Sequence, residues 1–150
     1  MLLGSSAFAC GEYIPRRFSG LGSNISPPVH WMQLPPDTKS LALVLEDPDT
    51  SKAFTHWLIY NIPPNRVGLP EAVPTEPNLP DGVRQGLNSE GETGYTGPYP
   101  PPNRVHHYHF RLFALDTELK LKASCHQADL LKAMEGHIID QTDLTGLFVV

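Results

Sequence analysis

Hydrophobic residues form three runs whose spacing predicts β-strands. Residues 40–49, SLALVLEDPD, alternate three leucines with Ala42 and Val44, so both faces of the run are apolar. An apolar run of this kind is typical of a strand buried inside a sandwich of two sheets. The Asp-Pro-Asp at its end is a good turn sequence, because Asp caps backbone amides and Pro presets φ.

The other two runs have the same character. Residues 54–62, FTHWLIYNI, end at Pro63 and Pro64, and residues 105–116 follow a proline-rich loop. Because side chains alternate along a strand, one face of the last run holds His106, Tyr108, Phe110, Leu112 and Ala114. The final residues, LTGLFVV, predict a short closing strand.

One helix is predicted near the end of the chain. Ser124 and Gln127 are three positions apart, which is the pattern of a capping box at a helix start. The apolar positions that then recur at helical spacing are Leu130, Leu131, Met134 and Ile138. We expect this stripe to pack on the sheet, which gives a mostly β fold with one helix packed at one end.

Two segments, residues 14–31 and 64–102, have almost no hydrophobic periodicity. An irregular stretch as long as the second is uncommon in a compact domain unless it serves a function. Its prolines at 100–102 favour a stiff extended run, and Gly94 and Gly97 permit backbone conformations closed to other residues. We therefore predict a preformed wall of a binding site, since preformed walls lower the ordering cost of binding.

The composition fits a single domain spanning residues 1–150. A chain of this length buries enough surface for one core. Its 16 prolines and 18% charged residues suit turns and strand ends better than helix interiors. A nucleic-acid partner is not expected, because the net charge is −5 and Arg16–Arg17 is the only adjacent basic pair.

No segment predicts secretion or a membrane span. The opening MLLGSSAFAC has no positive start, and small residues break its apolar run. No apolar run approaches the ~18 residues of a spanning helix. Cys10 and Cys125 form neither a disulfide framework nor a metal-ligand pattern. The expected location is the cytoplasm, with both thiols reduced.

Polar residues stand at the ends of all three predicted strands: Asp47, Asp49, His56, His106 and Tyr108. Each has an ordinary alternative, as part of a turn, a core histidine bonded to a carbonyl, or a frayed strand end. By alternation, however, Asp47 points inward with the leucines, and His56 shares the face of Phe54 and Leu58. Two inward histidines would each need a partner, because an unpaired buried polar group costs about 1–3 kcal/mol.

Carboxylates beside imidazoles fix the ring tautomer and favour its protonated form. Such a group offers donors to an anion from histidine and acceptors to a cation from aspartate. Asp47 and Asp49 would repel a bare phosphate unless histidine protons and backbone N–H groups outweigh them. A zwitterion with phosphate and ammonium poles suits the site better.

A metal site and an enzyme are weaker interpretations. His107 and His109 share a strand face, but zinc needs three or four ligands, and Arg111 next in line would oppose a cation. Neither the nucleophile motif G-x-S-x-G nor a glycine-rich phosphate loop is present. We therefore predict no metal, no cofactor and no catalysis.

The sequence resembles the phosphatidylethanolamine-binding proteins, specifically their short bacterial and archaeal branch, described as Raf kinase inhibitor-like. The resemblance covers nearly the full length. Its motifs, in order, are SSAF, IP, SPP, SLALVLEDPD, THWLIYNIP, GYTGPYPPPNRVHHY, FALD, KAMEGHII and LTG. The series DPD, HW, GPxPP and H-x-Y is highly specific, because four separated motifs agree in order.

The resemblance implies a β-sandwich with a small pocket at one end for phosphate-like anions and phosphorylated headgroups. The motifs place these residues in it: Asp47, Asp49, His56, Gly97, Pro100, Pro101, His106 and Tyr108. Two departures stand out. His107 replaces the usual arginine, so any help it gives an anion should depend on pH, and Tyr99 stands where the branch usually has cysteine.

Three functions follow from these features. The first is a non-enzymatic binding module for a phosphorylated small molecule or phospho-group, with affinity rising as the pH falls through about 6.5. The second is inhibition of a protein kinase or serine protease through the outer surface or residues 64–102. The third and weakest is hydrolysis with His56 or His106 as the base. The resemblance also suggests a homodimer.

Overall fold

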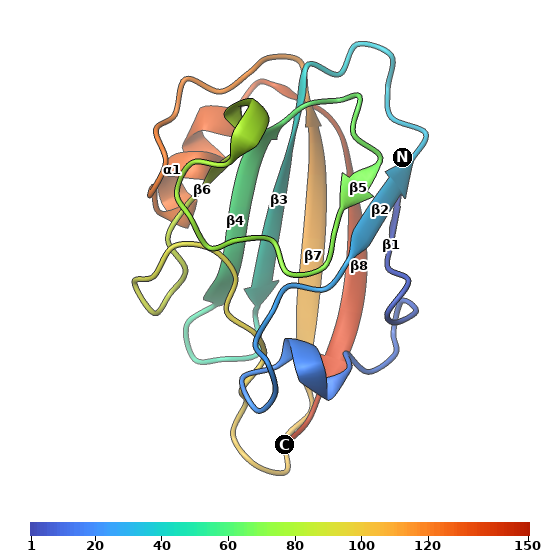
Figure 1. The fold of residues 1–150 in the computed structure, drawn as a ribbon, viewed down its shortest axis with the longest axis vertical. Coiled ribbons are helices and arrows are strands. Elements are labelled where there is room, and N and C mark those ends of the chain that lie inside the picture. Colours follow the sequence, from blue (N-terminus) through green and yellow to red (C-terminus); the bar gives the residue numbers. More distant parts are fainter.

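The computed structural model describes residues 1–150 as two antiparallel sheets packed face to face, with a single α-helix (Figure 1). The smaller sheet has the order β1-β2-β5, formed by Leu2–Gly4, Val29–Met32 and Gly68–Leu69. The larger sheet has the order β6-β4-β3-β7-β8, formed by Arg84–Gln85, Phe54–Ile62, Ser40–Asp47, His106–Leu115 and Ile138–Phe148. The fold is therefore mostly β, as the three hydrophobic runs predict.

β3 lies at the centre of the larger sheet, between β4 and β7, and all eight of its residues are buried. Leu41, Leu43 and Leu45 face the smaller sheet, where Val29 and Trp31 of β2 pack in the same core. Burial on both faces explains why this strand lacks a polar face in the sequence.

The opposite face of the larger sheet is covered in part by α1 (Gln127–Met134). Leu130 and Met134 are completely buried there, against Val44 of β3 and Leu58 of β4. The helix thus packs on the sheet, as expected, through Leu130 and Met134.

The start and end of the helix differ from the prediction. The capping box is formed by His126 and Asp129, whereas Ser124 has a left-handed backbone with φ 63° and lies outside the helix. Leu131 is exposed, and Ile138 begins β8 because Gly136 has φ 77° and breaks the helix. The predicted short closing strand is therefore the full-length β8, paired along all of β7.

The two irregular segments contain short elements that the sequence pattern does not predict. They are β2 and the 3-10 helix η1 (Arg16–Phe18) in the first, and β5, β6 and the 3-10 helix η2 (Pro80–Gly82) in the second. Gln85 fixes the second segment, because it accepts from Trp57 Nε1 and donates to the carbonyls of Pro74 and Glu76. Neither helix type provides a segment long and apolar enough to span a membrane.

Candidate ligand-binding pocket

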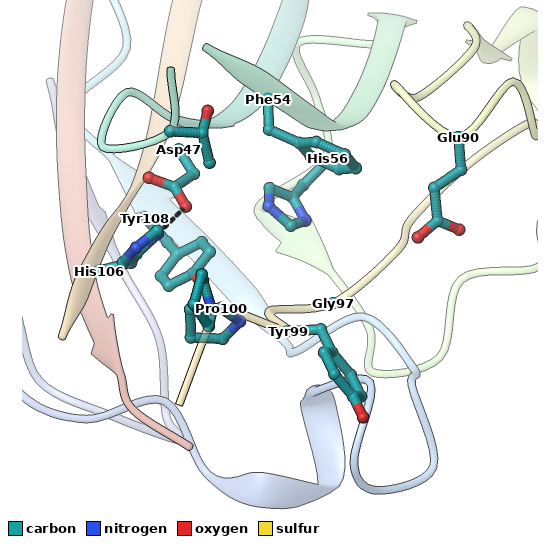
Figure 2. Close-up of a pocket in the computed structure, with 11 residues that line it drawn as sticks. Asp47, Phe54, His56, Glu90, Gly97, Tyr99, Pro100, His106 and Tyr108 are labelled. Carbon is teal, nitrogen blue, oxygen red and sulfur yellow. Dashed lines mark hydrogen bonds and ion pairs between the residues drawn. The ribbon is translucent and has the colours of Figure 1, made fainter. Parts of the chain in front are cut away.

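A pocket of about 240 Å³ opens where β3 ends and β4 and β7 begin (Figure 2). It is lined by Asp47, Thr50, Phe54, His56, Glu90, Gly97, Tyr99, Pro100, Pro101, His106 and Tyr108. Seven of the eight predicted site residues are among them, and only Asp49 is not. This volume suits a small polar group, since pockets for drug-sized ligands are typically about 300–1,000 Å³.

Asp47 and His106 form a buried pair on one side of the pocket. Asp47 Oδ2 lies 2.6 Å from His106 Nδ1, and the residues are 2% and 4% exposed. The other carboxylate oxygen accepts the backbone N–H of Asp49 at 2.8 Å. Because a carboxylate accepts hydrogen bonds, Nδ1 of His106 is the protonated nitrogen, and Nε2 is the one that faces the pocket.

A β-bulge turns His56 toward the same pocket. Leu45 of β3 pairs with Trp57 of β4, but the next residue of β3 already pairs with Thr55, so His56 has no partner across the ladder. Bulges of this kind redirect a side chain and are frequent beside functional sites. The prediction that His56 shares a face with Leu58 is wrong, because Leu58 packs against α1 on the opposite side of the sheet.

His56 is uncharged at neutral pH. Its Nδ1 lies 2.7 Å from the carbonyl oxygen of Thr96, and burial lowers the pKa of its imidazole to about 4. The backbone hydrogen bond and the negative charge of Asp47 act in the opposite direction but are weaker. The expectation that a neighbouring carboxylate favours the protonated form therefore fails at His56, because the cost of desolvating the charge is larger.

Aromatic rings form the floor of the pocket. The ring of His56 lies 4.6 Å from that of Phe54 and 5.2 Å from that of Tyr108, which it meets edge-on. Burial, with the nearby negative charge of Asp47, raises the pKa of Tyr108, so its phenol keeps its proton. The floor thus presents one neutral imidazole and one hydroxyl donor.

The proline loop, residues 97–102, is held by the N-terminal segment. The Gly97 N–H donates to Asn24 Oδ1 at 2.6 Å, and the Gly20 N–H donates to the Pro98 carbonyl at 2.8 Å. A Cβ on Gly97 would lie 2.1 Å from the Phe18 carbonyl oxygen, so only glycine fits this close approach. The loop is therefore a preformed wall, and its rigidity comes from these contacts as well as from proline.

The same contacts leave the wall with few backbone donors. The Gly97 N–H already donates to Asn24, and Pro100 and Pro101 have no backbone N–H. The backbone N–H groups that were expected to offset the carboxylates are therefore missing at these three positions. No lysine or arginine lines the pocket, whereas Asp47 and Glu90 both do.

Asp49 and His107 lie outside the pocket and bond to each other. Asp49 Oδ2 accepts the His107 backbone N–H at 2.7 Å and lies 2.8 Å from His107 Nδ1. Partial burial acts to raise the pKa of Asp49, but these hydrogen bonds outweigh it and lower the pKa below its usual value. The pair therefore links β7 to the turn after β3, and His107 is not in position to contact a ligand in the pocket.

Four lining residues were not predicted from the sequence: Thr50, Phe54, Glu90 and Tyr99. The sequence could have indicated Phe54, because it lies two positions before His56 in the predicted strand and so shares its face. Glu90 reaches the pocket from a turn in which Asn88 Oδ1 accepts its backbone N–H, and no periodicity marks such a turn. Tyr99 is exposed at the rim, with its ring packed on Gly20.

No three His, Cys, Asp or Glu side chains are arranged to hold a metal ion. Cys10 is exposed and Cys125 is buried under α1, and the two thiols are free. The end of the sandwich is therefore the strongest candidate site.

Comparison with known proteins agrees with this architecture. Residues 4–149 match the family model described as phosphatidylethanolamine-binding protein. A relative in Methanothermobacter thermautotrophicus, named UPF0098 protein, is 50% identical over 99% of this chain and 98% of its own. A second, from Pyrococcus horikoshii, is 43% identical over 96% of this chain and 74% of its own.

Two crystal structures are also closely similar. A phosphatidylethanolamine-binding protein homolog from Chlamydia trachomatis has a TM-score of 0.90 and 37% identity, covering 99% of this chain and 96% of its own. YbcL of E. coli, described as a new member of the mammalian family, has a TM-score of 0.90 and 29% identity, covering 99% and 97%.

Proposed function

The chain belongs to the phosphatidylethanolamine-binding protein family, and from that premise we propose that it is a non-enzymatic binding protein whose pocket takes a small phosphorylated group. The ligand is either a free phosphorylated molecule or a phospho-group presented on a larger one. A pocket of about 240 Å³ accommodates the headgroup alone.

The observation that supports this proposal most is the meeting of Asp47, His56, His106 and Tyr108 at one cavity. These side chains come from three strands, and every buried side-chain nitrogen or oxygen in the protein has a partner. Nε2 of His106 and the Tyr108 hydroxyl have no partner in the protein, so they reach the open surface of the pocket. The Tyr108 hydroxyl can donate to a phosphate oxygen, and Nε2 of His106 can do so when its ring carries protons on both nitrogens.

The charges of the pocket favour a ligand that has both a phosphate and an ammonium group over a bare phosphate. Asp47 and Glu90 line the pocket without a lysine or arginine to offset them. An ammonium group on the ligand would be attracted to these carboxylates, while its phosphate contacts His106 and Tyr108. Phosphoethanolamine has this arrangement and serves as the probe.

Calorimetry tests the proposal directly. Phosphoethanolamine and inorganic phosphate are titrated into the wild-type protein, His106→Ala and Tyr108→Phe, with His30→Ala as a control on the exposed face of β2. We expect His106→Ala to weaken binding at least about tenfold, since a hydrogen bond to a charged group contributes about 1.5–3 kcal/mol. Equal binding by all four proteins would place the ligand elsewhere.

The same samples report on catalysis. Phosphorus NMR of phosphoethanolamine incubated with the wild-type protein should show no release of phosphate. Release that depends on His106 would replace the binding proposal with a hydrolytic one.

A further inference from the structure

His56 presents a hydrogen-bond acceptor to the pocket. Its Nδ1 is 2.7 Å from the Thr96 carbonyl oxygen, which can only accept, so Nδ1 holds the ring proton. The residue is 5% exposed, and burial disfavours a second proton on the ring. Nε2 therefore has a free lone pair. It has no partner in the protein, and because no buried nitrogen lacks one, it opens onto the pocket.

The groups around this lone pair do not supply its proton. Asp47 faces it from β3 as a carboxylate, and Glu90 lines the pocket from the loop before β7. His106 has its Nδ1 directed to Asp47. Tyr108 meets the His56 ring edge-on, at 5.2 Å between centroids, and has its hydroxyl available to a ligand. The hydroxyl of Thr50 already donates to the Lys52 carbonyl.

A fully ionised phosphate fits this set of groups poorly. All of its oxygens would be acceptors, so the oxygen beside His56 would face the Nε2 lone pair and the carboxylates of Asp47 and Glu90, and the proline loop offers no N–H from Gly97, Pro100 or Pro101. An acceptor facing another acceptor in a buried site loses a hydrogen bond and adds repulsion. A phosphate that retains one proton can donate it to Nε2 of His56, which restores the hydrogen bond and removes the repulsion between two acceptors.

We infer that the pocket selects phosphate monoesters in their singly protonated form, with the P–OH donating to Nε2 of His56. The remaining phosphate oxygens then accept from the Tyr108 hydroxyl and from Nε2 of His106, which donates when the ring carries protons on both nitrogens, with Nδ1–H directed to Asp47. The inference rests on the proposed function and adds the ionisation state and ester class of the ligand. Phosphate diesters, which have no P–OH, are disfavoured.

The first experiment asks whether the pH dependence of binding comes from a proton on the ligand or from a proton on the protein. It uses two ligands with different second pKa values, methyl phosphate and methylphosphonate. Affinity is measured by calorimetry from pH 5.5 to 8.5. If the ligand holds the proton, affinity falls about tenfold per pH unit above the second pKa of each ligand, so the midpoint moves with the ligand. A midpoint common to both ligands assigns the proton to the protein and overturns the inference, while leaving the proposed function intact.

Dimethyl phosphate provides the matched test of the P–OH, because it is a monoanion with no proton to donate. At pH 5.5 it should bind the wild-type protein at least about tenfold more weakly than methyl phosphate. His56→Phe keeps an aromatic ring between Phe54 and Tyr108 but removes the acceptor, and it should reduce this preference to within about twofold. His30→Ala should retain it.

The outcomes separate the two proposals. Equal binding of methyl and dimethyl phosphate by the wild-type protein overturns the inference alone. A full preference that persists in folded His56→Phe does the same. If no phosphate ligand binds at any pH, the inference and the proposed function both fail.

Discussion

Nδ1 of His106 lies 2.6 Å from Oδ2 of Asp47, although the two residues are 59 positions apart in the sequence. The pair joins the last residue of β3 to the first residue of β7, at the end of the sandwich where the pocket opens. It orients the imidazole, and it gives one oxygen of the buried Asp47 carboxylate a hydrogen-bond partner.

Replacing His106 with alanine should destabilise the protein, because Asp47 Oδ2 would lose its partner in a buried site. We expect a loss of about 1–3 kcal/mol in the free energy of unfolding, measured by urea denaturation at pH 7. His109→Ala is the matched control, since His109 pairs with Asp143 on the sheet surface. Exposed pairs contribute about 0–1 kcal/mol, so similar losses in both variants would contradict the role of burial.

The pH dependence of stability should report on His56. Its pKa is about 4 in the folded protein and near 6.5 in the unfolded chain. Between these values the unfolded chain binds a proton that the folded protein does not, so stability falls as the pH drops through this window. Relative to His56→Phe, the wild-type protein should lose about 2–3 kcal/mol between pH 7 and pH 4.

Urea denaturation of both proteins at several pH values measures that difference. Each protein contains the same other titrating groups, so their contributions cancel in the comparison. Parallel stability curves for the two proteins would mean that His56 is not buried as an uncharged ring.

Asn24 should control the rigidity of the proline loop. It has φ 55°, which Asn and Gly tolerate, and its Oδ1 accepts the Gly97 N–H at 2.6 Å. Asn24→Gly keeps the backbone conformation but removes the acceptor, so hydrogen exchange at Gly97 should accelerate and phosphoethanolamine binding should weaken. Asn24→Asp retains an acceptor and should bind nearly as well as the wild-type protein. Equal exchange rates in Asn24→Gly and the wild-type protein would rule out this restraint.

Glu90 should favour ligands that contain an ammonium group. Glu90→Gln removes a carboxylate from the pocket lining, so affinity for inorganic phosphate should rise a few-fold and the preference for phosphoethanolamine should shrink. Because Glu90 is exposed, the effect should be largest at low ionic strength. Glu92→Gln, in the same turn but outside the pocket lining, is the control. If both substitutions act alike, the cause is net charge and not position.

The central strands and the helix were predictable from hydrophobic periodicity, because each buries a regular set of apolar side chains. β5 and β6 have two residues each, too few to form a pattern, and they are defined by pairing to strands far along the chain. The start of α1 was misplaced because His126 caps it with Asp129, whereas the pattern at Ser124 and Gln127 looks equally suitable in the sequence.

Most of the pocket was also predictable, since polar residues at the ends of apolar strands are conspicuous. Two features were not. The bulge that reorients His56 depends on the register between β3 and β4, and alternation cannot reveal it. The uncharged state of His56 depends on how deeply the ring is buried, which the neighbouring carboxylates in the sequence do not indicate.

A crystal structure grown with phosphoethanolamine at pH 6 would show whether the phosphorylated ligand occupies this pocket. We predict a phosphate in the pocket with one oxygen within hydrogen-bond distance of each of three groups: His56 Nε2, His106 Nε2 and the Tyr108 hydroxyl. A phosphate bound outside this cavity, or a cavity that stays empty at ligand concentrations that saturate the protein in solution, would contradict it.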